Sequence, residues 1–210
     1  MHSGPPVAAV RALLFDLGGV LIDIDFDRAI AHWASMSALS RDEISKRFRI
    51  DEPYQLHERG KLPAAEYFDH LRATLQLRGE TEQIVKGWNS IFISEIEETR
   101  RLVETARKAL PCYAFTNTNP THQAFWTSKY PLVAACFDHV FVSSDIGLRK
   151  PDREAFRHVS ETLAVPASSI MFFDDLLENV SGASAAGLQA VHVQGPRDVL
   201  AAVRAIGIAL

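Results

Sequence analysis

Short apolar runs recur along this chain, and most of them end in a compact group of polar residues or glycines. The runs close with FDLGG, FTNTN, VSSD, FFDD and VHVQ, at residues 15–19, 115–119, 142–145, 172–175 and 191–194. Runs of this length and composition are typical of buried strands. Patterns with helical periodicity lie between them, at 97–109, 122–130, 153–163 and 178–186. This alternation predicts an α/β fold with a Rossmann-like, mostly parallel sheet, whose reactive groups collect at the carboxyl ends of the strands.

Residues 23–95 interrupt the alternation. They contain no convincing strand and read as short amphipathic helices at 26–37, 41–48, 63–75 and 81–92. Ser40 followed by Glu43 resembles a capping box, and turn-prone pieces at 51–53 and 59–61 separate the helices. We therefore predict an α/β core formed by 1–22 and 96–210 and an inserted helical cap formed by 23–95. A cap placed above the first polar group can exclude water and select substrates. Its large aromatic side chains are predicted to form its own hydrophobic core: Trp33, Phe48, Trp88 and Phe92.

Composition narrows the range of partners. The chain has 210 residues and a net charge of −4, with no basic tract and no long apolar stretch, which predicts neither a nucleic-acid nor a membrane partner. Cys112 and Cys136 lie in apolar runs and are expected to be buried free thiols of a reducing compartment. A short loose leader at 1–6 lacks the features of a signal peptide, so the predicted location is cytoplasmic. The oligomeric state stays open.

Two of the polar groups offer a nucleophile and hydrogen-bond donors. Asp16 follows a buried strand and precedes Gly18 and Gly19, where backbone can approach a ligand closely; a turn that ends the strand is the alternative. Thr116 and Asn117 supply a hydroxyl and an amide that can bind phosphoryl oxygens. Ordinary turn chemistry explains the same two residues.

The other two groups offer charges of opposite sign. Lys150 precedes Pro151, and a fixed ammonium there could offset phosphate charge; a solvated surface lysine is the alternative. Asp174 and Asp175 follow an apolar run, where carboxylates are costly without a compensating cation. Magnesium prefers such oxygen ligands. The same pair could instead begin a helix as an N-cap with an acidic first turn.

Together, the order and spacing of these motifs resemble the haloacid dehalogenase-like hydrolase superfamily with a type-1 cap, over about residues 9–193. FDLGGVL resembles the first motif of that family, FTNTN the second, Lys150 the third, and FFDD with Asn179 the fourth. DIDFDRAI, HERG, TNTN and FFDD further resemble bacterial sugar-phosphate phosphatases, notably the glucose-1-phosphate phosphatase group.

The resemblance implies a role for each matching residue. Asp16 would attack phosphorus and form an aspartyl-phosphate. Thr116 and Asn117 would hold the transferring oxygens, and Lys150 would neutralise charge and orient Asp16. The implied cofactor is Mg²⁺, with Asn179 supporting the site and with these metal-site residues: Asp16, Asp175, the backbone carbonyl of Gly18, and Asp174, directly or through water.

One position departs from the family pattern. Phosphatases of this family usually carry a second aspartate two residues after the nucleophile, as general acid and base, and here that position is Gly18. Such proton transfer is typically worth about 10² to 10⁴-fold in rate. The leaving group could need little protonation, His57 or Glu58 of the cap could supply the proton, or catalysis could be weak. His57 and Glu58 are also candidate substrate contacts, although such residues beside Arg59 and Gly60 most often form a solvated turn between helices. We expect Trp126 to face the site.

The sequence therefore predicts a magnesium-dependent phosphatase acting on a small phosphorylated metabolite such as a sugar phosphate. One alternative is a metal-independent haloacid dehalogenase, which Gly18 fits but the acidic pair at Asp174 and Asp175 disfavours. The other is a binding module that kept the fold and lost the proton donor.

Overall fold

The computed structural model describes residues 8–209, and the predicted leader lies outside them. Five strands form a sheet in the order β5-β4-β1-β6-β7, and every neighbouring pair is parallel. The α/β fold predicted from the sequence is confirmed. The strands are β1 (Ala12–Phe15), β4 (Cys112–Thr116), β5 (His139–Val142), β6 (Ile170–Asp174) and β7 (Gln189–His192).

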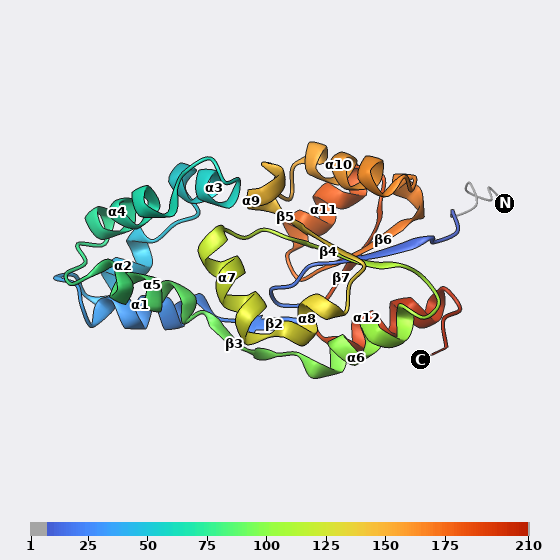
Figure 1. Cartoon of the computed structure of the whole chain (residues 1–210), viewed down its shortest axis with the longest axis horizontal. Coiled ribbons are helices and arrows are strands. Elements are labelled where there is room, and N and C mark those ends of the chain that lie inside the picture. The colour runs from blue at the N-terminus through green and yellow to red at the C-terminus, as the bar shows by residue number, and fades with distance from the viewer. Residues whose placement is uncertain (1–7, 210) are drawn as a thin grey trace.

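Helices cover both faces of this sheet (Figure 1). Side chains alternate between faces along a strand, so Leu13 and Phe15 of β1 join one apolar cluster and Leu14 joins the other. One cluster includes side chains of α6 and α12, and the other includes side chains of α10 and α11. The helices of the core are α6 (Glu97–Ala106), α7 (Pro120–Lys129), α8 (Pro131–Ala135), α9 (Ser143–Ile146), α10 (Arg153–Leu163), α11 (Leu177–Ala185) and α12 (Pro196–Ala205).

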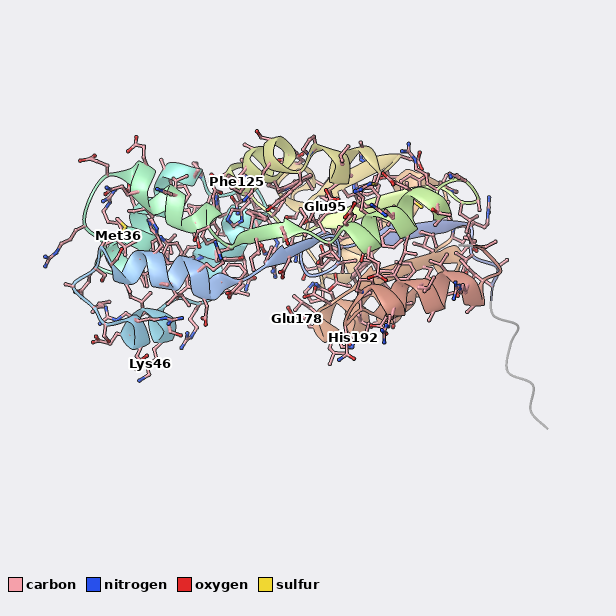
Figure 2. All side chains as sticks on the ribbon, turned by 90° about the horizontal axis from the view of Figure 1, so that it is seen from below. Met36, Lys46, Glu95, Phe125, Glu178 and His192 are labelled. Carbon is pink, nitrogen blue, oxygen red and sulfur yellow. The ribbon has the colours of Figure 1, made fainter. Side chains whose placement is uncertain are left out.

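Five more helices gather beyond one end of the sheet, in the segment predicted as the cap (Figure 1). Seen from below, Met36 and Lys46 lie among them, far from His192 on the core (Figure 2). The Ser40–Glu43 capping box is present. Trp33 and Trp88 are fully buried and stack at 6.1 Å between ring centroids. They belong to an apolar cluster that also includes Leu13 and Phe15 of β1, so the expectation that the cap has a hydrophobic core of its own was wrong. Phe92, which was predicted for that core, also lines the cavity described below. The helices are α1 (Phe26–Ala34), α2 (Arg41–Arg47), α3 (Glu52–Glu58), α4 (Ala64–Thr74) and α5 (Thr81–Asn89).

Two features of this segment differ from prediction. β2 (Ile22–Ile24) and β3 (Phe92–Glu95) pair antiparallel, so the expectation of no strand in 23–95 was wrong. Strands of three or four residues are too short to show a recognisable alternation of apolar and polar residues. The supposed turn at 51–53 begins helix α3, where the Asp51 side chain accepts a hydrogen bond from the Tyr54 N–H and Pro53 occupies the first turn. Proline is well tolerated there because its missing N–H has no helical partner.

The cysteines behave as predicted, and Cys112 and Cys136 are buried and not disulfide-bonded. Within residues 8–209, no helix combines the length and the apolar character that crossing a membrane requires. The division of the chain into a core and a mobile cap stays a prediction, with the β2–β3 pair at its expected boundaries.

Candidate active site

Polar side chains meet where neighbouring parallel strands end. Asp16 follows β1, Thr116 ends β4 and Asp174 ends β6. The backbone N–H of Asp16 donates to the carbonyl of Phe173 on the adjacent strand at 2.8 Å, which extends the sheet pairing to the nucleophile candidate. The backbone N–H of Leu17 donates to Asp16 Oδ1 at 2.7 Å. The sheet itself therefore fixes the position of this carboxylate.

Lys150 is not a surface lysine. Its side chain is fully buried, with Nζ 2.9 Å from Asp16 Oδ1 and 2.7 Å from Asp174 Oδ2. Burial alone would lower the pKa of Lys150, but the negative charges of Asp16 and Asp174 outweigh burial and raise it. The Asn117 side chain accepts a hydrogen bond from the Lys150 N–H and donates one to the Lys150 carbonyl, both at 2.9 Å. Asn117 therefore holds the backbone that presents the ammonium.

The two adjacent aspartates have different surroundings. Asp174 is fully buried, and its oxygens accept hydrogen bonds from Lys150 Nζ, Asn179 Nδ2 and the Leu176 N–H. The Asp175 carboxylate is half-buried and accepts no hydrogen bond from a residue in the described part of the chain. It lies so close to Gly19 that a Cβ there would be 2.3 Å from Asp175 Oδ2. Asp174 thus anchors other side chains, whereas Asp175 is available to a ligand.

Three carboxylates with mutually close oxygens surround one ammonium. Asp16, Asp174 and Asp175 each offer an oxygen within 4.8 Å of the others. Burial raises the pKa of Asp16 to about 8, with Lys150 opposing the rise and the two other aspartates adding to it. Burial and the charge of Asp174 also raise the pKa of Asp175. A divalent cation with oxygen ligands would relieve this repulsion, so the side chains present fit such an ion.

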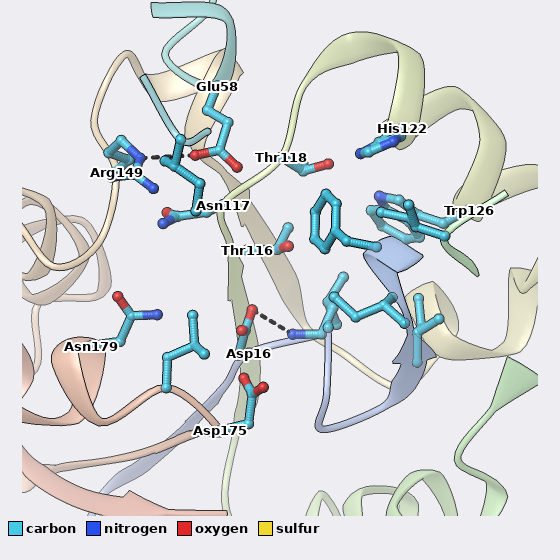
Figure 3. A pocket seen from close by; sticks show the side chains of 18 of the residues that line it. Asp16, Glu58, Thr116, Asn117, Thr118, His122, Trp126, Arg149, Asp175 and Asn179 are labelled. Atoms are coloured by element: carbon cyan, nitrogen blue, oxygen red, sulfur yellow. Dashed lines mark hydrogen bonds and ion pairs between the residues drawn. The ribbon is translucent and has the colours of Figure 1, made fainter. Parts of the chain in front are cut away.

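A cavity of about 410 Å³ opens above these carboxylates (Figure 3). Asp16, Thr116 and Asp175 lie at its floor, and Trp126 lines it as expected. Core and cap segments both contribute to its walls. The remaining lining residues are Leu17, Gly18, Ile22, Ile24, Phe26, Ile50, Tyr54, Glu58, Ile91, Phe92, Asn117, Thr118, His122, Arg149, Leu176, Glu178 and Asn179.

Glu58 faces the cavity from the cap side and is buried, not solvated (Figure 3). Its Oε2 accepts a hydrogen bond from Arg149 Nε at 2.9 Å, and both side chains are at most 10% exposed. Burial raises the pKa of Glu58, although the Arg149 guanidinium opposes the rise. This pair joins α3 to the loop that carries Lys150, so the cap segment is tied to the floor of the site.

The structure does not bring His57 to the cavity, of which it lines no part. The ring is 1% exposed, stacks on Tyr67 at 4.5 Å and hydrogen-bonds through Nδ1 to the Leu62 carbonyl at 2.9 Å. Burial lowers the pKa of His57. Consecutive helical residues point in different directions, and this places Glu58 at the cavity and His57 among the aromatic side chains of the cap.

Arg149 and His122 are two of several cavity residues that the sequence reasoning missed. Arg149 stands next to Lys150 in GLRKPD, and the second cation of that motif was the available signal. His122 is buried near the start of α7, where its Nε2 donates to the Trp88 carbonyl at 3.0 Å and Nδ1 faces the Asn119 amide at 3.3 Å. Burial lowers the pKa of His122 to about 3. No local pattern marks a histidine whose partner is a distant backbone carbonyl.

Known proteins resemble the chain over most of its length. Phosphatase MT3486 of Mycobacterium tuberculosis is 28% identical over 194 residues, 88% of each chain. The D-ribitol-5-phosphate phosphatase of Bacteroides thetaiotaomicron is 27% identical over 179 residues, 81% of this chain and 85% of that protein.

Solved structures show the same architecture. A haloacid dehalogenase family enzyme of Bacteroides thetaiotaomicron, in complex with magnesium and inorganic phosphate, superimposes with a TM-score of 0.78 and 26% identity. That comparison covers 89% of this chain and 96% of the other. A family model matches residues 10–187. This range includes the strand-end groups at 15–19, 115–119, 142–145 and 172–175, and it excludes the group at 191–194. The chain is therefore an enzyme of the haloacid dehalogenase-like hydrolase family.

Proposed function

We propose that this protein is a magnesium-dependent phosphatase that hydrolyses a small phosphorylated metabolite through an aspartyl-phosphate intermediate. The observation that carries the proposal is the contact of Lys150 with both Asp16 and Asp174, beside the free carboxylate of Asp175, at the floor of a cavity. The phosphatases among its relatives and the magnesium and phosphate in a similar structure support it.

The reaction would divide into two displacements at phosphorus. The Asp16 carboxylate attacks phosphorus, the bond from phosphorus to the alcohol oxygen breaks, and that oxygen leaves with the bonding electrons. Water then attacks the phosphorus of the aspartyl-phosphate, which releases inorganic phosphate and restores Asp16. Lys150 orients Asp16 and favours its ionised form, since an opposite charge at 2.9 Å stabilises a carboxylate.

The groups around Asp16 could hold the metal ion and bind the phosphoryl oxygens. Asp16, Asp175 and the Gly18 carbonyl would hold Mg²⁺, which would offset the negative charge of the phosphoryl oxygens. Asp174 would act indirectly, because Lys150 and Asn179 already occupy its oxygens. The Thr116 hydroxyl would bind a phosphoryl oxygen, while Asn117 would contribute through its backbone N–H, since its side chain holds Lys150.

The cap would close the cavity and contact the alcohol portion of the substrate. Glu58 is the candidate contact, because it lines the cavity and its ion pair with Arg149 holds it in place. The sugar phosphate predicted from the sequence is one candidate substrate, supported by the ribitol phosphate in the name of one relative. Exclusion of water by such a cap would strengthen every charge interaction at the floor.

A release assay tests the proposal. Phosphate release is measured over a panel of phosphorylated metabolites with magnesium and with a chelator, and halide release from 2-haloacids is measured alongside. We expect phosphate release that requires magnesium. Halide release without metal would support the dehalogenase instead, and binding of phosphorylated compounds without any turnover would support a binding module.

A further inference from the structure

We infer that the site selects phosphate monoesters whose alcohol portion is apolar and whose leaving hydroxyl is acidic, an aryl phosphate being the simplest example. This inference rests on the proposed phosphatase function and names its substrate class. It differs from the sugar phosphate that the sequence motifs suggest. Two observations carry it, one beside the nucleophile and one along the cavity walls, and Ile24 contributes to both.

The first observation concerns the space beside Gly18, where related phosphatases carry their proton donor. A Cβ built on Gly18 would lie 2.9 Å from Cδ1 of Ile24. The side chain of Ile24, from strand β2, therefore fills the space into which an aspartate at this position would project. The group nearest to this point of the site is a hydrocarbon, which cannot transfer a proton.

The missing donor constrains the leaving group. When Asp16 attacks, the bond from phosphorus to the leaving oxygen breaks and that oxygen departs as an anion, which later takes its proton from water. A phenol-type hydroxyl, with a pKa near 10 in tyrosine, tolerates this charge far better than an alkyl hydroxyl. An acidic leaving hydroxyl therefore compensates for a general acid typically worth about 10² to 10⁴-fold.

The second observation is the apolar wall that follows from the same strand pair. Side chains of β2, of β3 and of the residues next to them line the cavity, together with Trp126 of α7 (Figure 3). These residues offer carbon surfaces and almost no hydrogen-bonding groups. The apolar wall consists of Ile22, Ile24, Phe26, Ile91, Phe92 and Trp126.

Four of the polar side chains that line the cavity are engaged within the protein: Glu58, Arg149, His122 and Asn117. Glu58 is paired with Arg149. His122 uses both ring nitrogens within the protein, and Asn117 uses its amide on Lys150. A polyol would need several further donors and acceptors, since a buried hydroxyl without a hydrogen bond costs about 1–3 kcal/mol. An apolar group meets the same walls at no such cost.

The entrance to the cavity is also apolar. Ile50, from the cap segment, is 56% exposed, and Leu176, from the loop after β6, is 48% exposed. Both line the cavity, and they are two of the five large hydrophobic side chains that stand exposed in the described part of the chain. These two side chains add exposed apolar surface to the lining of the cavity, which also includes the exposed Glu178.

Four phosphate esters separate the effect of an apolar alcohol portion from the effect of an acidic leaving hydroxyl. Hexyl phosphate and glucose 6-phosphate share a primary alkyl leaving group and differ in polarity, and 1-naphthyl phosphate adds an acidic hydroxyl to an apolar body. Glucose 1-phosphate combines a polar body with the more acidic anomeric hydroxyl. We expect kcat/KM for hexyl phosphate to exceed that for glucose 6-phosphate by about tenfold or more, as for other apolar pockets. We expect 1-naphthyl phosphate to be the best substrate.

Variants of the wall test the residue assignment. Ile24→Thr keeps a β-branched side chain and should lower kcat/KM for hexyl phosphate by about 5- to 10-fold relative to glucose 6-phosphate. Ile93→Thr is the matched control, because Ile93 lies on β3, is 38% exposed and does not line the cavity. The control should leave the ratio of the two substrates unchanged.

The proton donor is tested by restoring it. The double variant Gly18→Asp with Ile24→Ala removes the contact at Ile24. Relative to Ile24→Ala alone, it should raise turnover of hexyl phosphate about tenfold or more while changing 1-naphthyl phosphate little. A series of substituted phenyl phosphates gives a check on the parent protein. We expect the rate of phosphate release to fall steeply as the leaving phenol becomes less acidic. Rates that do not depend on the acidity of the phenol would show that the site contains a general acid, and would refute the missing proton donor.

The outcomes distinguish this inference from the proposed function. Magnesium-dependent release of phosphate with glucose 6-phosphate equal to or better than hexyl phosphate would leave the phosphatase assignment intact and refute the apolar substrate class. Absence of phosphate release from all four esters, with the folded state verified by circular dichroism, would contradict both. A preference for hexyl phosphate that Ile24→Thr does not reduce would contradict the role given to this wall.

Discussion

The floor and the roof of the cavity are built by different kinds of contact. At and just beneath the floor, Asp16, Thr116 and the buried Asp174 are brought together by pairing of the neighbouring strands β1, β4 and β6. At the roof, Glu58 meets Arg149 across 91 positions of the chain, through side chains alone. Sheet pairing makes the floor a consequence of topology, whereas the roof depends on a few individual side chains.

The cap segment and the core share one apolar cluster, and polar contacts also join them; for example, the Ser143 hydroxyl donates to the Glu58 carbonyl at 2.7 Å. Besides the Glu58–Arg149 pair, Arg59 contacts Asp152 at 2.7 Å. Gly60 has a φ of +64° and approaches so closely that a Cβ there would be 2.3 Å from the Ser144 carbonyl oxygen. These polar contacts lie outside the sheet pairing, which is compatible with the proposal of a movable cap over a fixed chemical centre.

The largest effect is expected at the floor. Asp16→Asn removes the proposed nucleophile and should lower phosphate release by at least about 10³-fold. Its stability without metal should stay within about 1 kcal/mol of the parent, because the change also removes a charge from a crowded group of carboxylates. Assays of phosphate release and urea unfolding in a chelator measure the two effects. Activity close to that of the parent would refute Asp16 as the nucleophile.

Lys150→Met should combine lost activity with lost stability. Nζ is the cation shared by Asp16 and Asp174, so its removal leaves two buried carboxylates without their partner. Breaking a buried ion pair in this way costs about 3–5 kcal/mol. Urea unfolding should show this loss, while Lys108→Met at an exposed lysine serves as the control and should stay near the parent value. Equal stability of the two variants would show that Lys150 does not hold the floor together.

This comparison also explains what could be read from the sequence. Asp16, Thr116 and Lys150 each follow or end a strand-like run, and parallel strands bring their carboxyl ends to one edge, so local patterns sufficed for the floor. Glu58 was named, but its burial and its partner Arg149 depend on how α3 packs on the core. Ile24 was not named, since nothing local shows that a side chain six residues away fills the space beside Gly18.

Helix α3 illustrates the same limit within the cap. Pro53 suggested a turn, yet proline at the start of a helix is compatible with the helix that follows. The short β2–β3 pair could not be predicted, because its two strands lie about 70 residues apart in the sequence and each is too short to show an alternation of apolar and polar residues.

At the roof, two ion pairs can be compared by double-mutant cycles. Glu58 and Arg149 are at most 10% exposed, whereas Asp152 in the Arg59–Asp152 pair is 45% exposed. With alanine or glutamine replacements, we expect a coupling energy of about 1.5–3 kcal/mol for the first pair and at most about 1 kcal/mol for the second. Urea unfolding measures both, and equal coupling energies would contradict the idea that the buried pair carries the junction.

Kinetic constants of a Glu58 variant distinguish a role in substrate positioning from a role as proton donor. If Glu58 positions substrate, Glu58→Gln should raise KM more than it lowers kcat, and it should act equally on aryl and alkyl phosphates. If it donates a proton, kcat should fall most for the alkyl phosphate, whose leaving oxygen needs protonation more. We expect the first pattern, since Arg149 at 2.9 Å opposes protonation of the carboxyl group.

The smallest effect concerns His122, which joins the two regions. Its ring stacks on Trp88 of the cap at 4.3 Å, and its Nε2 donates to the carbonyl of the same residue. Burial lowers the pKa of His122 from 6.5 to about 3 in the folded protein. The unfolded chain therefore binds a proton below about pH 6.5 that the folded protein does not bind. The stability that depends on neutral His122 is fully present above pH 6.5 and is lost as pH falls toward 3.

Between about pH 7.5 and about pH 5.5, this linkage should remove about 1.4 kcal/mol of unfolding free energy from the parent. Asp16 and other groups titrate in the same range, so the test is the difference between the parent and His122→Gln, in which their contributions cancel. The variant should lose about 1.4 kcal/mol less than the parent over this interval. Equal losses would show that His122 titrates normally.

An NMR titration of the parent provides a second measurement that needs no variant: the His122 ring resonances should not shift between these pH values. A shift centred near pH 6.5 would mean that water reaches the junction between cap and core, and that the two regions separate more readily than their stacked rings indicate.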